Sequence, residues 1–69
     1  MRPADLLRAA GQVLYGERWQ SPLARDLGVS DRTMRRWAVD GPPESVRPEI
    51  DALLANRQAA IVHVRDAIR

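Results

Sequence analysis

The chain has 69 residues, of which 45% are apolar, and its formal net charge is +2. This length fits one small domain, whose single core is marginal without a disulfide, a metal or a partner subunit. The sequence has no cysteine and one histidine, which excludes disulfides and cysteine-based zinc sites, so a second copy of the chain is the most available source of extra buried area.

The positive charge is concentrated in the middle of the chain. All 11 basic residues are arginine, and five of them lie between residues 18 and 36, where there are only two acidic residues. Residues 42–69 hold four arginines and four acidic residues. A surface that faces phosphates needs such a local excess of positive charge, so this distribution favours a nucleic-acid partner.

No apolar run is long enough to cross a bilayer, and no apolar signal segment follows Met1. We therefore expect a cytoplasmic protein of a bacterial or phage-infected cell, without a membrane partner. The same features are compatible with a eukaryotic nucleus.

Helical spacing of apolar residues runs through the chain, and no window alternates as a β-strand does. We expect a first helix over about residues 3–14, with Pro3 in its first turn and Gly16 after its end. Its inward face holds Leu6, Leu7, Ala10, Val13 and Leu14. Gly11 lies within this helix, and we expect it to allow another helix to approach closely.

A second helix is expected over about residues 20–27, with Ser21 and Pro22 as a cap and first-turn pair. Its inward residues are Leu23, Ala24 and Leu27. Gly28 suits the left-handed conformation that ends a helix, and Val29 then enters the core.

A third helix is expected from the N-cap Ser30 to about Val39, with Met34 and Trp37 facing the core. Trp19 is expected to pack where the first two helices meet, or to flank a DNA backbone. Residues 40–43, Asp-Gly-Pro-Pro, end the third helix.

The last helix is expected over about residues 48–68, opened by Pro48 with Glu49 and Asp51 in its first turn. A helix of this length spans about 30 Å, which is more than a compact core of this size requires. Residues 50–54 can close the core, and the apolar stripe beyond them is a candidate dimer interface. The predicted interface residues are Ile61, Val64 and Ile68 of this stripe, together with Leu54 just before it.

Residues 20–38 carry the strongest signal for function. Two short helices joined by a glycine turn, the second with a capping serine and three arginines, are typical of a helix-turn-helix that places one helix in the major groove of DNA. We therefore predict an all-α domain of four to five helices that binds duplex DNA. A helical hairpin that merely packs is the alternative.

The segment Gln-Ser-Pro-Leu-Ala-Arg-Asp-Leu-Gly-Val-Ser-Asp-Arg-Thr-Met-Arg-Arg-Trp, residues 20–37, resembles the lambda-repressor-like (Cro/C1-type, XRE) helix-turn-helix family, and with its flanks the resemblance covers about residues 3–55. The chain departs from the family's pattern at Trp19, where a capping serine or threonine is usual, at Pro22, and at Ala38, where an acidic residue is frequent. The string from Ser30 to Arg35 is also similar to the small autorepressors encoded beside phage anti-CRISPR genes.

The resemblance implies roles for individual residues. Gln20 matches a position that contacts a phosphate. The positions that reach bases are matched by Asp31, Arg32 and Arg36, with Thr33 and Arg35 at the margin. Ser30, Arg25 and Arg18 are further candidates for phosphate contact, the two arginines having solvated surface as their alternative.

Elementary chemistry supports Arg32 as the principal base reader. Arginine pairs bidentately with O6 and N7 of guanine, and Arg32 lies in the first turn of the third helix, which enters the groove most deeply. Arg35 and Arg36 point about 100° apart, so we expect one to read a base and the other to hold the backbone. Asp31 can accept from cytosine, but it also suits the helix dipole and a pair with Arg35.

Catalysis is not expected. The four glycines are scattered, there is no cysteine nucleophile, and the single His63 is far in sequence from every serine. We predict no metal, no cofactor and no small-molecule ligand. The expected function is a homodimeric repressor that binds an inverted repeat, with its own operon as the expected target. A protein-interaction module, such as an antitoxin or a phage assembly adaptor, is the second hypothesis.

Overall fold

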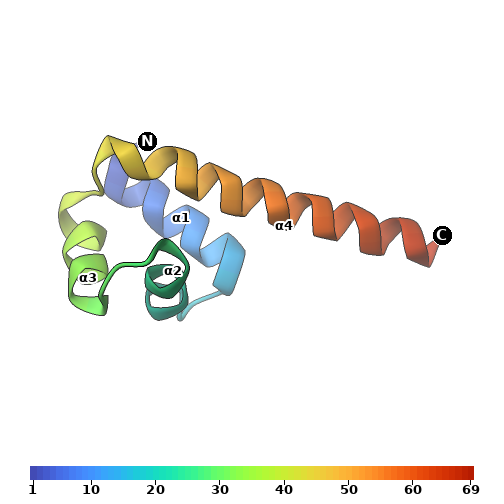
Figure 1. Cartoon of the computed structure of the whole chain (residues 1–69), viewed down its shortest axis with the longest axis horizontal. Helices are drawn as coiled ribbons and strands as arrows, with labels where there is room; N and C mark the ends of the chain where they lie inside the picture. The colour runs from blue at the N-terminus through green and yellow to red at the C-terminus, as the bar shows by residue number, and fades with distance from the viewer.

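The computed structural model describes residues 1–69 and contains helices but no strand. The elements are α1 (Pro3–Tyr15), α2 (Gln20–Leu27), α3 (Asp31–Asp40), a short 3-10 helix η1 (Glu44–Val46) and α4 (Arg47–Ile68). Figure 1 shows α1, α2 and α3 gathered under the first part of α4, while the rest of α4 projects away from them. The extents of the molecule are 43 × 20 × 19 Å. The predicted all-α class, with four α-helices and a long C-terminal one, is confirmed.

The core is built from all the helical elements. Leu7 of α1, Leu23 of α2 and Met34 of α3 are its fully buried side chains. The other buried apolar residues are Ala10, Leu14, Trp19, Ala24, Val46 and Ile50. Trp37 and Val29 are half-buried and pack against this cluster, so their predicted inward orientation is confirmed.

Gly11 lies against the ring of Trp19. A Cβ atom at Gly11 would be 2.6 Å from Cδ2 of Trp19 and closer still to Cε3, so no side chain fits between them. Trp19 is 4% exposed. The prediction that another helix approaches Gly11 closely is therefore wrong, because the indole ring of Trp19 occupies that space.

The first helix has a narrower inward face than predicted. Leu7, Ala10, Gly11 and Leu14 are its buried residues, whereas Val13 is 69% exposed. At 100° per residue Val13 points about 120° away from the middle of the buried set. The prediction that Val13 belongs to the core is wrong.

The second helix begins at Gln20 as predicted, but Ser21 is not its cap. Trp19 is the N-cap residue, its backbone is helical, and no side chain caps the helix. Ser21 and Pro22 therefore lie inside the first turn. Gly28 adopts the left-handed conformation (φ 72°, ψ 29°), and its N–H donates to carbonyl groups of the last turn, as the glycine signal predicts.

The fourth helix begins at Arg47, directly after η1, which the sequence did not indicate. Ile50 is buried, and Leu53 and Leu54 pack against the core, so this part of α4 closes the domain as predicted. Every residue from 55 to 69 is exposed. None of these helices is both long and apolar enough to traverse a lipid bilayer.

Candidate nucleic-acid interface

The capped start of α3 sets the direction of the arginine-bearing helix. The backbone N–H of Thr33 donates to Oγ of Ser30 at 3.1 Å, which confirms Ser30 as the N-cap. The Ser30 hydroxyl in turn donates to Oγ1 of Thr33 at 3.0 Å. Both hydroxyl groups are thus engaged within the cap, and Thr33 is half-buried. These two candidates are less available to DNA than the exposed arginines.

The outer face of α3 is centred on Arg32. Met34 is buried and Trp37 half-buried, which fixes the inward direction of the helix. With 3.6 residues per turn, Arg32 points almost directly opposite to this inward side, and Arg36 and Arg35 flank it at about 40° and 60°. The structure therefore brings the three predicted arginines together on one exposed face.

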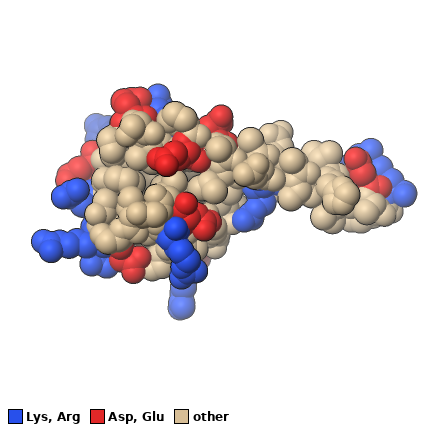
Figure 2. Space-filling model, viewed as in Figure 1, with Lys and Arg blue, Asp and Glu red and all other residues tan.

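The arginines of this face have no carboxylate partner. The one ion pair in the molecule joins Arg47 to Glu44 at 3.9 Å, within η1 and the start of α4. Figure 2 shows basic side chains standing out from the end of the globular part that holds α3 and from its lower edge. Guanidinium groups that are exposed and unpaired can donate to phosphates or to guanine edges.

Asp31 is oriented by α2 and does not pair with Arg35. Its Oδ1 accepts a hydrogen bond from Oγ of Ser21 at 3.3 Å. No ion pair with Arg35 is formed, so that alternative is wrong. Asp31 lies in the first turn of α3, where the helix dipole favours a negative charge. Its place is at the edge of the outer face, about 100° from Arg32.

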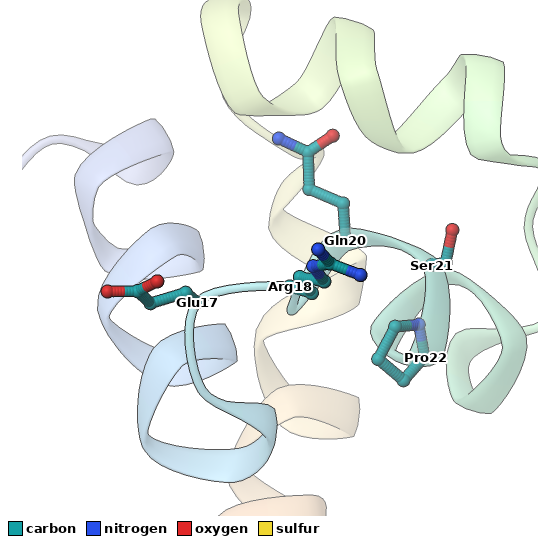
Figure 3. Close-up of a pocket in the computed structure, with 5 residues that line it drawn as sticks. All are labelled: Glu17, Arg18, Gln20, Ser21 and Pro22. Atoms are coloured by element: carbon teal, nitrogen blue, oxygen red, sulfur yellow. The ribbon is translucent and has the colours of Figure 1, made fainter.

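A second polar group lies at the start of α2. Glu17, Arg18, Gln20, Ser21 and Pro22 line a hollow of about 420 Å³ between the α1–α2 connection and the first turn of α2. Figure 3 shows the side chains of Gln20 and Ser21 pointing to the same side, toward α3, while Glu17 points away. The backbone N–H groups at the start of α2, which no side chain caps, lie at this hollow. Such a position suits the binding of an anion.

The structure separates the residues that were predicted to contact phosphates into two groups. Arg18 and Gln20 line one hollow beside α3, whereas Arg25 lies in the last turn of α2 and does not line it. Arg25 is exposed, and a basic residue in a last turn suits the helix dipole. The structure supports Arg18 and Gln20 more strongly than Arg25.

Val39 is a candidate that sequence reasoning missed. It is 80% exposed and lies seven residues after Arg32, so it extends the same outer face toward the end of α3. An exposed apolar side chain beside arginines can contact the methyl group of thymine. The signal was present in the sequence, because Val39 falls on the arginine side of the helix and not on the side of Met34.

The predicted dimer residues fall into two groups. Ile61, Val64 and Ile68 are 50%, 57% and 79% exposed, as an unpaired interface requires. Leu54 is half-buried and packs against the core, so its main role is within the domain.

One further contact joins α1 to α2. The hydroxyl of Tyr15 donates to Oδ2 of Asp26. Burial, this hydrogen bond and the charge of Asp26 raise the pKa of Tyr15 to about 12, while Arg57 of α4 opposes the shift. The contact holds the end of α1 against α2. No cluster of residues that could hold a metal ion is present.

Comparison of the chain with protein-family models, with curated proteins and with solved structures gives no significant match.

Proposed function

We propose that this protein binds duplex DNA in a sequence-specific manner and regulates transcription as a homodimeric repressor. The observation that carries the proposal is the outer face of α3, where Arg32, Arg35 and Arg36 are exposed and free of carboxylates. The face begins at a capped helix start that lies beside the N-terminus of α2. A helix presented in this way fits the major groove of B-form DNA.

The three arginines have different tasks in this proposal. Arg32 reads a guanine through O6 and N7, since it lies in the first turn and at the centre of the face. Arg36, about 40° to one side, reads a neighbouring base, and Arg35, on the other side, contacts the backbone. Asp31 positions the start of α3 through Ser21, and Thr33 remains at the margin of the contact.

Affinity comes from phosphates. Gln20 and Arg18 bind a phosphate in the hollow at the start of α2, together with the backbone N–H groups there. Ser30 and Arg25 are secondary contacts. Since arginine–phosphate contacts release counterions, binding weakens steeply with salt.

The proposed assembly has two copies of the chain on an inverted repeat, with their recognition helices in major grooves one helical turn, about 34–36 Å, or a multiple of it apart. Repression is steric, because the dimer covers the promoter. The proposal requires no cofactor and no small-molecule ligand, and it places the protein in the cytoplasm of a bacterial or phage-infected cell, with its own operon as the target.

Selection from a pool of randomised duplexes tests the proposal. The protein is expected to enrich an inverted repeat whose half-sites contain guanine, and its affinity for the enriched duplex should fall linearly with salt on logarithmic axes. Enrichment of no sequence, together with equal affinity for all duplexes at low salt, would contradict sequence-specific binding.

A second candidate function is a protein-interaction module, such as an antitoxin or a phage assembly adaptor. The observation in its favour is the uncovered apolar face of α4 beyond Leu54. A chain that binds no duplex even at low salt, yet is folded, supports this candidate over the repressor.

A further inference from the structure

Val39 lies at the end of the outer face of α3, and the proposed function leaves it without a task. It is 80% exposed, although its neighbours Trp37 and Ala38 pack against the core. One exposed valine is ordinary on a protein surface. Val39 is distinguished by its place, since it is the only large exposed apolar residue that lies on α3.

Val39 completes a stripe that the three arginines begin. Arg32, Arg35, Arg36 and Val39 have the spacing i, i+3, i+4 and i+7, which places four side chains along one side of a helix. At 100° per residue, Val39 points within about 20° of the direction of Arg32, and it lies about 10 Å further along the helix axis. Recognition helices that lie along the major groove contact bases from positions with these same spacings. The last of the four positions is therefore within reach of base edges.

The last turn of α3 is held in place by the rest of the domain. The backbone N–H of Gly41 donates to the carbonyl group of Trp37 at 2.8 Å. Gly41 lies against the start of α1, because a Cβ atom at Gly41 would be 3.0 Å from Cβ of Pro3. Within a helix, a β-branched side chain has one strongly preferred rotamer. Val39 therefore presents its methyl groups in a fixed position.

The chemistry of this last turn does not suit a phosphate. The turn contains no basic residue, and Asp40 follows Val39 directly. The negative end of the helix dipole lies here as well, and it disfavours a further negative charge. Valine itself has no side-chain hydrogen-bond donor. The contact that this end of α3 can make in a groove is therefore apolar.

We propose that Val39 determines specificity by recognising a thymine in each half-site through the C5 methyl group of the base. Among the four standard bases of DNA, thymine is the one that places a methyl group in the major groove. The inference rests on the proposed function, because it requires α3 to lie in that groove. Since successive base pairs are roughly 3.4 Å apart, the thymine lies within about three base pairs of the guanine that Arg32 reads.

This contact also rejects cytosine. A cytosine in place of the thymine lacks the methyl group and presents its N4 amino group to the groove. Val39 offers this amino group no acceptor, so the contact would leave a donor without a partner at a surface from which water is excluded. Each half-site is thus read by hydrogen bonds at Arg32 and Arg36 and by an apolar contact at Val39.

Replacement of thymine by deoxyuridine tests the contact, because it removes only the methyl group of the base. Each thymine of the enriched duplex is replaced in turn, and the affinity of the wild-type protein is measured by fluorescence anisotropy. Replacement at one position of each half-site is expected to weaken binding about two- to fivefold per half-site, the magnitude for one buried methyl group. Replacement of thymines outside the half-sites is the control and should leave binding unchanged.

The same series of duplexes with Val39→Ala assigns the contact to its residue. This variant should bind the thymine duplex about two- to fivefold more weakly per half-site and should not distinguish deoxyuridine from thymine. Because Val39 is exposed, thermal unfolding of the variant should match that of the wild type. Val13→Ala shortens an exposed valine of α1 and should keep the full discrimination between thymine and deoxyuridine.

Three results overturn the role of Val39 while leaving the proposed function in place. One is an enriched half-site without an invariant thymine. Another is wild-type protein that binds equally well with thymine or deoxyuridine at every position. The third is Val39→Ala protein that keeps the full discrimination between these bases. A protein that enriches no sequence contradicts the proposed function, and this inference with it.

Discussion

The hydroxyl of Ser21 donates a hydrogen bond to Oδ1 of Asp31 across 3.3 Å, and this contact joins the start of α2 to the start of α3. The two segments are the ones proposed to face a phosphate and the major groove. Their relative position is therefore set in part by a pair of exposed side chains.

The first prediction concerns this pair. Ser21→Ala and Asp31→Ala should each lower the free energy of unfolding by about 0.5–1 kcal/mol, through the lost hydrogen bond and, for Asp31, the lost dipole interaction. The double variant should lose less than the sum, as urea titrations in a double-mutant cycle would measure. The contrary result is that the two losses of unfolding free energy add strictly and that Asp31→Ala changes the base preference. That result would make Asp31 a base reader.

The second prediction concerns Gly11. Alanine within a helix normally stabilises it by about 1 kcal/mol relative to glycine. At Gly11 the new methyl group meets the ring of Trp19, so Gly11→Ala should destabilise the domain by about 1–3 kcal/mol. Gln12→Ala, one residue along on the exposed side, is the control and should change stability little. A Gly11→Ala variant that melts higher than wild type would refute the packing described.

This position also shows how far the sequence predicts the fold. The apolar spacing and the cap and turn residues, Ser30 and Gly28, define the helices, because these signals are local in the chain. The partner of Gly11 is not local: a ring eight residues away fills the space by tertiary packing. The exposure of Val13 has the same origin, since it depends on where α4 crosses α1.

The candidate site was predictable to a similar extent. The outward direction of Arg32 follows from helical spacing once Met34 is known to be inward. The bond from Ser21 to Asp31 did not follow, because it depends on the angle between two helices. The short helix η1 was missed because it spans only three residues, too few for an apolar period.

The third prediction concerns Tyr15, the only tyrosine in a chain that has no lysine and no cysteine. Its ordinary pKa of 10.0 is raised to about 12, chiefly by burial and by Asp26. The neutral form of Tyr15 therefore makes its full contribution to the free energy of unfolding below pH 10. This contribution is lost as the pH rises through about 12. Absorbance titration of tyrosinate should give the raised pKa in the folded protein.

Tyr15→Phe and Asp26→Asn serve as controls for this titration. Tyr15→Phe should remove the loss of stability between pH 10 and 12, and Asp26→Asn should lower the pKa of Tyr15 toward its ordinary value. A midpoint near 10.0 in the folded wild type would show that the contact with Asp26 is absent.

The fourth prediction concerns the apolar face of α4 beyond Leu54. Ile61→Asp should convert the dimer to a monomer, because it places a charge on the face that pairs, and it should weaken operator binding. Ala59→Asp adds the same charge on the opposite side of α4 and should leave the dimer unchanged. Analytical ultracentrifugation distinguishes the two variants. If Ile61→Asp remains dimeric, the interface lies elsewhere.

The most direct test of the central claim is the affinity of Arg32→Ala for the enriched duplex, measured by fluorescence anisotropy beside Arg8→Ala. Arg8 is an exposed arginine of α1, so its variant loses the same charge from a different helix. Arg32→Ala should bind about 1–3 kcal/mol more weakly and should lose its preference for guanine at one position of each half-site, with its thermal unfolding unchanged. Equal affinities and equal base preferences for the two variants would contradict the assignment of α3 as the DNA-reading helix.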